Sequence, residues 1–219
     1  DIKKVRIKWK EEITKELEKN PHLELLTPED KIKDVRKKWL KLQRSDEIKK
    51  KYSLFENLNY QREKFYKPLL HALGFDYQPR NQISIINGEV YEIPILSEVI
   101  NSKNDSLLWV VECFNGTDED IDPLEFNLHA FNSLSHDDSK ELFFKSDSWE
   151  EVISAQIFGQ DLPPRWVLII SKHQLLLIDR QKWAASRLLR FDLDNLFGEN
   201  DPDAILAFTT LLHREHICP

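Results

Sequence analysis

The sequence predicts an α/β fold in which a mixed central sheet is flanked by helices and preceded by an N-terminal helical arm. Up to Gly74 the apolar residues recur at steps of three and four, which is the spacing of amphipathic helices. Beyond Gly74 the pattern changes to alternation and to short apolar runs, which are typical of strands. The 219 residues, 41% of them hydrophobic, suffice for a large domain and an arm. We therefore predict an arm over residues 1–52 and an α/β domain over residues 53–219.

Three helices are expected before the sheet. The first covers residues 2–19, where Asn20-Pro21 ends the periodic pattern. The second begins at Thr27-Pro28, because a Thr cap followed by Pro favours a helix start. The third runs from about Asp46 to Gly74, with a break near Asn57–Asn59. Trp9 and Trp39 lie on apolar helix faces, so we expect them to pack against the domain and not to stack on bases.

The sheet is expected to begin with a hairpin. Residues Gln82–Ile86 and Glu89–Val99 read as its strands, and Asn87-Gly88 between them is a strong turn signal. The run Leu107–Phe114 is almost wholly apolar, which predicts a central strand covered on both faces.

The second half of the sheet follows a further helix. A capping box at Ser148–Glu151 opens that helix. Three more strands are predicted, at Trp166–Ile170, Gln174–Ile178 and Arg187–Phe191. A last helix begins at Asp201-Pro202.

Charge is unevenly distributed along the chain. Residues 1–52 hold 17 Lys and Arg against 11 Asp and Glu, a balance of +6. The totals are 31 and 38, so residues 53–219 hold 14 and 27, a balance of −13. The basic arm could contact the phosphates of duplex DNA, and the residues we single out for this are Lys37, Lys38, Lys41 and Arg44. Because these lysines alternate with acidic residues at helical spacing, a solvated helix surface is the favoured alternative.

Composition also indicates where the protein works. No apolar run approaches the roughly 20 residues of a membrane-spanning helix, and no signal peptide opens the chain. The only cysteines, Cys113 and Cys218, are far apart, so we expect a soluble protein in the reducing cytoplasm. The sequence contains no Met, even at position 1. Either the chain is a fragment or processed product of a longer one, or Met residues are missing from the sequence as written.

Three segments carry a family resemblance. They are YQREKFYKPLLHALGFDYQP (60–79), RWVLIISKHQLLLIDR (165–180) and RLLRFDLDNLF (187–197). Together they resemble the N-terminal nuclease-like region of type IIG-like restriction–modification proteins and related phage-defence DNA adenine methyltransferases, over about residues 48–219. The resemblance implies a PD-(D/E)xK nuclease-type fold. It also implies duplex DNA as a partner and a downstream methyltransferase domain that uses S-adenosylmethionine.

The resemblance also locates a nuclease site. In such nucleases a Pro-Asp opens one strand, and the next strand carries a Glu or Asp with a Lys two residues on; the carboxylates hold Mg²⁺ and the Lys orients the attacking water. Here Pro94-Ile95 stands in place of Pro-Asp, and Glu112-Cys113-Phe114 in place of Glu-x-Lys. The Asp and the Lys are therefore missing. Candidates to complete a rearranged site around Glu112 are Glu92, Glu98 and the accessory polar residue Gln156.

We therefore expect no catalysis from this chain. Glu112 is predicted to be buried and hydrogen-bonded to backbone or to Gln156, and Phe114 to seal the apolar side of the sheet. The leading hypothesis is a non-catalytic module that positions DNA or a partner for the methyltransferase and holds no cofactor of its own. The alternatives are an active Mg²⁺-dependent nuclease with a rearranged site, and a protein-interaction module.

Other chemistries find less support in the sequence. His213, His216 and Cys218 are too few for a structural zinc site, which needs four ligands, so no metal is expected there. No Gly-rich phosphate loop occurs, nor does the Asn/Asp-Pro-Pro-Tyr/Phe loop of adenine methyltransferases. Cys113 is expected to be a small buried hydrophobe.

Overall fold

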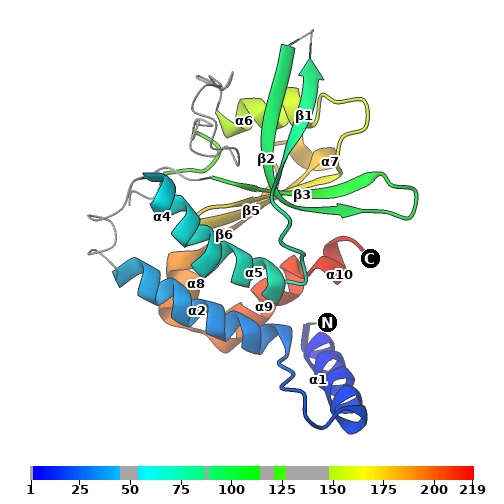
Figure 1. The fold of residues 1–219 in the computed structure, drawn as a ribbon, viewed down its shortest axis with the longest axis vertical. Helices are drawn as coiled ribbons and strands as arrows, with labels where there is room; N and C mark the ends of the chain where they lie inside the picture. The colour runs from blue at the N-terminus through cyan, green and yellow to red at the C-terminus, as the bar shows by residue number, and fades with distance from the viewer. Residues whose placement is uncertain (1, 45–53, 87–88, 114–120, 127–147) are drawn as a thin grey trace.

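The protein has one mixed sheet flanked by helices, with a helix at its N-terminus (Figure 1), which confirms the predicted α/β class. The structure, a computed structural model, describes residues 2–44, 54–86, 89–113, 121–126 and 148–219, with the backbone alone at residues 54–55, 84–86 and 89–92. Within these residues no helix is long and apolar enough to cross a membrane.

Among the described residues the sheet has six strands, and their order in space is their order in the sequence. They are β1 (Arg80–Ile86), β2 (Glu89–Ile100), β3 (Ser106–Glu112), β4 (Trp166–Ile170), β5 (Gln174–Asp179) and β6 (Leu188–Asp192). β3 and β4 are parallel, and all other neighbours are antiparallel. The apolar run that begins at Leu107 therefore forms a central strand, as predicted. β4 and β5 follow it in the same sheet, also as predicted.

Helices precede, interrupt and follow the strands. Those before the sheet are α1 (Ile2–Lys19), α2 (Pro28–Arg44), α4 (Leu54–Gln61), the π-helical turn η1 (Arg62–Tyr66) and α5 (Lys67–Ala72). Between β3 and β4 lie α6 (Trp149–Glu151) and the π-helical turn η3 (Val152–Ile157). The helices described after β5 are α7 (Arg180–Trp183), α8 (Leu193–Glu199), α9 (Pro202–Leu212) and α10 (Arg214–Ile217).

Several helix ends follow from local sequence. The Thr27 hydroxyl accepts a hydrogen bond from the Asp30 amide at 3.1 Å, and Ser148 and Glu151 form the predicted capping box. Gly74, with φ of +82°, ends α5 in the left-handed region that glycine tolerates. The break predicted near Asn57–Asn59 is wrong, because α4 is continuous there around the fully buried Leu58. The irregularity lies further on, in η1.

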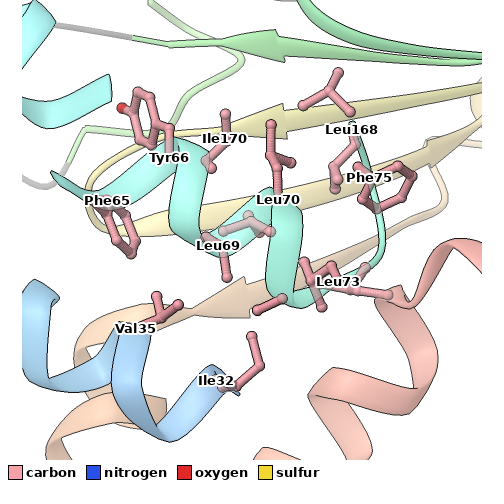
Figure 2. Packing of buried hydrophobic residues seen from close by; sticks show 14 of the residues in the cluster. Ile32, Val35, Phe65, Tyr66, Leu69, Leu70, Leu73, Phe75, Leu168 and Ile170 are labelled. Carbon is pink, nitrogen blue, oxygen red and sulfur yellow. The ribbon is translucent and has the colours of Figure 1, made fainter. Parts of the chain in front are cut away.

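Each face of the sheet has its own apolar core. On one face, α2, α5, α8 and α9 pack over strand residues such as Leu108, Val110 and Leu168 (Figures 1 and 2). On the other face, α6 and η3 pack over Ile95 and Val111. Side chains alternate along β3, so its residues belong to the two cores in turn. The central strand is thus covered on both faces, as its apolar sequence predicts.

The helices of the predicted arm are packed against the body of the protein. Four residues of α2 belong to the first core: Ile32, Val35, Trp39 and Leu42. The Trp39 indole donates a hydrogen bond to the carbonyl of Lys172 at 2.9 Å. Trp9 of α1 is buried, its ring centroid 5.2 Å from that of His213. Both tryptophans therefore pack as predicted, and α2 is no free arm. The predicted boundary at residue 52 lies outside the described residues.

Candidate functional site

The candidate site is centred on Glu112, the last residue of β3. Its neighbour Val111 belongs to the core under α6 and η3. Alternation directs Glu112 to the opposite face, which the helices before the sheet cover. Glu112 has an exposed fraction of 0%. A carboxylate removed so fully from water is costly unless a partner neutralises it.

That partner is Arg62, in the π-helical turn η1. Its Nε donates to one carboxylate oxygen of Glu112 at 2.9 Å, and its Nη2 donates to the other. The Arg62 side chain is only 6% exposed. The predicted burial and hydrogen bonding of Glu112 are confirmed. The predicted partners, backbone or Gln156, are wrong, because the guanidinium group holds both oxygens.

A signal for Arg62 exists in the sequence. It lies three and four residues before Phe65 and Tyr66, which are fully buried. A charged side chain on an apolar helix face needs a partner of opposite charge inside the protein. What the sequence could not supply was the tertiary contact, since η1 and the end of β3 are 50 residues apart.

A polar group of neighbours surrounds the pair. The Asn59 side-chain oxygen accepts from Arg62 Nη1 at 3.4 Å, and the Tyr66 hydroxyl accepts from the Gln61 amide at 2.5 Å. Burial raises the pKa of Tyr66 well above its ordinary value, and raises the pKa of Tyr77 to about 12. Both phenols therefore stay neutral and can only exchange hydrogen bonds. The Arg62–Glu112 pair carries the charge of this site.

The electrostatics of the pair follow from burial. Burial raises the pKa of Glu112, and Arg62 opposes this by hydrogen bonding and by its charge. Burial alone would lower the pKa of Arg62, but the Glu112 carboxylate raises it overall. Because a guanidinium group does not lose its proton in proteins, a protonated Glu112 would leave a buried unpaired cation. The pair is therefore ionised at neutral pH.

The structure does not bring the other candidate ligands to Glu112. Ile95 is the register partner of Val111 and lies in the same core, so it faces away from Glu112. Glu98 is opposite Trp109, whose indole donates to it at 2.9 Å, and Arg80 also contacts its carboxylate. Trp109 and Val111 share a face. The interpretation of Glu98 as a ligand beside Glu112 is therefore wrong.

Gln156 and Glu92 are the two remaining candidates for the site around Glu112. Gln156 is buried in η3, which packs on the face opposite Glu112, so its predicted role beside Glu112 is also wrong. The backbone of Glu92 lies in β2, but its side chain, like Phe114, lies outside the described residues. In the part of the chain that the structure describes, no group of three or more His, Cys, Asp or Glu could hold a metal ion.

The cysteine and histidine residues that the sequence singled out lie in packed parts of the protein. Cys113 is buried in the core under α6, and burial raises the pKa of its thiol. His213 connects α9 to α10, and His216 lies within α10. Both rings contact Trp9, at centroid distances of 5.2 and 6.0 Å. Their positions are explained by packing of α1.

The predicted DNA-binding residues lie along the outer side of α2. Lys37 forms an ion pair with Asp34 at 2.6 Å. Lys38, Lys41 and Arg44 are exposed, and Lys38 lines a hollow between α2 and the helix formed by η1 and α5.

Comparison of the chain with protein-family models, with curated proteins and with solved structures found no match. The function therefore has to be inferred from the site itself.

Proposed function

We propose that this chain is a non-catalytic module with a nuclease-like fold, which positions duplex DNA or a partner for a restriction–modification-type DNA methyltransferase in phage defence. The observation that carries the proposal is the pairing of Glu112 with Arg62. The nuclease-like fold and the methyltransferase rest on the resemblance of residues 48–219, to which the observed order of hairpin, apolar strand, helix and paired strands conforms.

The Arg62–Glu112 pair is poorly suited to hold Mg²⁺. Both oxygens of Glu112 accept hydrogen bonds from the guanidinium group, so a metal ion would have to displace Arg62. A displaced guanidinium about 4 Å from a dication would be repelled by about 8 kcal/mol at an effective dielectric constant of 20. Mg²⁺ also gives up its water ligands reluctantly, and one carboxylate offers it little in return.

The alternative of an active nuclease with a rearranged site has less support. It requires a second carboxylate on the same face as Glu112. Glu98 lies on the other face and is bound by Trp109 and Arg80. Arg62 does not replace the Lys of the nuclease site, because its Nε and Nη2 already donate to the two oxygens of Glu112.

A plasmid-nicking assay tests the proposal. The purified chain, incubated with supercoiled plasmid and Mg²⁺ or Mn²⁺, is expected to leave the plasmid intact. Glu112→Gln and the matched Glu98→Gln variant serve as controls for contaminating nuclease. Metal-dependent nicking that disappears in Glu112→Gln and persists in Glu98→Gln would overturn the proposal in favour of an active nuclease.

One observation favours the interaction module as a second candidate. A hollow of about 540 Å³ beside β1 and β2 is lined in part by Ile83, Ile100 and Leu162, which are 59%, 50% and 77% exposed. Exposed apolar residues that gather around a hollow are typical of protein-contact surfaces. A chain that fails to bind duplex DNA even at low salt would favour this candidate over DNA positioning.

A further inference from the structure

A basic groove lies between α2 and the helix formed by η1 and α5, with a volume of about 360 Å³. One wall carries Lys31 and Lys38 of α2, and the other carries Lys67 and His71 of α5. Two acidic residues, Asp34 and Glu63, also line it. The lining thus holds three lysines against two acidic residues, in a chain of net charge −7.

The acidic residues in the groove are already neutralised. Asp34 is paired with Lys37 at 2.6 Å, and Glu63 is paired with Lys67 at 3.1 Å. Lys31 and Lys38 are exposed, and their side chains form no ion pair or hydrogen bond with another described residue. The groove thus offers two uncompensated ammonium groups to a ligand.

The spacing of these two ammonium groups is fixed by α2. Residues seven apart on a helix are about 10 Å apart along its axis and lie on the same side. Lysine carries its ammonium group on a long, flexible stem, so two lysines at this spacing can adjust to the separation of nearby phosphates on one DNA strand. Lys31 and Lys38 can therefore contact phosphates of a single strand.

The walls are held in place by the core beneath them. Lys31 and Lys38 each precede a buried residue, Ile32 and Trp39. Figure 2 shows Ile32 and Val35 of α2 directed toward the helix that carries Leu69. Burial of these side chains fixes the rotation of α2, so its lysines face the groove before any ligand arrives.

We infer that this groove binds the sugar–phosphate backbone of duplex DNA. The inference rests on the proposed function and gives the DNA a place on the surface. The groove changes the set of basic residues that the sequence predicts to contact DNA. Lys38 remains, whereas Lys37 is engaged by Asp34, and Lys41 and Arg44 lie outside the groove lining. Lys31 is added, and Lys67 lines the opposite wall but is paired with Glu63.

A matched pair of charge variants tests the inference. Lys31→Gln/Lys38→Gln removes the two groove charges, and Lys103→Gln/Lys182→Gln removes two exposed charges elsewhere. Binding of a fluorescein-labelled duplex of about 20 base pairs is followed by anisotropy at several salt concentrations. The groove variant should bind about tenfold or more weakly at low salt, and the slope of log K against log salt should fall by about 2, one unit for each lost phosphate contact. The control should bind within about twofold of the wild type.

A variant with the opposite expected effect separates binding from folding. Glu63→Gln releases Lys67 from its ion pair, so the duplex should bind more tightly. A loss of affinity caused by unfolding could not produce this gain. Circular dichroism melting curves of all variants verify that they are folded.

The outcomes separate the two proposals. If both double variants weaken binding equally, or neither does, the groove is not the DNA site, while DNA positioning stands. If the wild-type chain fails to bind duplex at low salt, both the groove assignment and DNA positioning fail. If a polyglutamate peptide binds in a groove-dependent way and the duplex does not, the groove is a site for acidic protein segments, which overturns the nucleic-acid assignment.

Discussion

Arg62 and Glu112 form a forked ion pair in which Nε and Nη2 of the arginine donate to different oxygens of the same carboxylate. The planar guanidinium group matches the carboxylate in this geometry, and a lysine could not. Arg62 lies in a π-helical turn, a rare element that is frequent at functional sites and whose wider turn changes the direction of the side chains around it.

Breaking this pair should cost much of the stability of the fold. Arg62→Met leaves a carboxylate buried without its cation, and Glu112→Leu leaves a buried guanidinium. Each is expected to lower the free energy of unfolding by about 3–5 kcal/mol. The double variant leaves no buried charge, so it should be less destabilised than the sum of the singles. Urea denaturation followed by circular dichroism measures all three, and additive losses would contradict the pairing.

Replacement of Gly74 should also destabilise the protein. Its φ of +82° strains any residue with a Cβ, and a Cβ there would lie 3.1 Å from Nε2 of the buried His213. Gly74→Ala should cost about 1–3 kcal/mol in thermal or urea unfolding. Gly198 is a matched control, because it lies within α8 and a Cβ there meets no atom within 4 Å. Gly198→Ala should be neutral or stabilising by up to about 1 kcal/mol, and equal losses at both positions would contradict this account.

Glu98 should contribute to the loss of stability in acid. Burial acts to raise its pKa, but hydrogen bonds from Trp109 and Arg80 bring the pKa below the ordinary value of 4.5. A carboxyl with a lowered pKa in the folded state stabilises the fold above about pH 4.5 and loses this contribution as the pH falls through its folded pKa. Glu98→Gln should therefore be more destabilising at pH 7 than at pH 3.

Urea denaturation at pH 7, 4 and 3 measures this difference. Glu125→Gln is the control, because the Glu125 side chain is exposed. An effect of Glu98→Gln that stays constant across the three pH values would show that its hydrogen bonds do not depend on the carboxylate charge.

Local chemistry in the sequence predicts much of the fold. Thr27, Ser148 and Asp201 mark helix starts that the structure confirms, because their side chains accept hydrogen bonds from backbone amides of the first turn. The apolar run through Val110 predicts the covered central strand. The π-helical turn at Arg62 could not be predicted, since its i→i+5 bonds leave no trace in apolar spacing. The asparagines around Leu58 favoured a break, but burial of Leu58 outweighs their low helix propensity.

The candidate site was predictable only in part. Glu112 follows an unbroken apolar run, so its burial could be predicted. Its partner could not, because the pairing depends on how the helices before the sheet pack on it. The sequence alone also could not predict on which face of the sheet the Ile95 side chain lies. It depends on the register between β2 and β3, which shifts between Ile95 and Ser97, and a shift of one residue moves a side chain to the other face.

The strand order has a consequence for how the chain folds. β1, β2 and β3 form one antiparallel meander, and β4, β5 and β6 form another. Each meander can form through contacts between neighbouring segments, whereas the parallel joint of β3 with β4 requires closure of a long loop. We therefore expect that the two meanders form first and that pairing of β3 with β4 then joins them. Glu112 lies opposite Ile170 at the end of this joint, so its charge is buried where the two halves of the sheet meet.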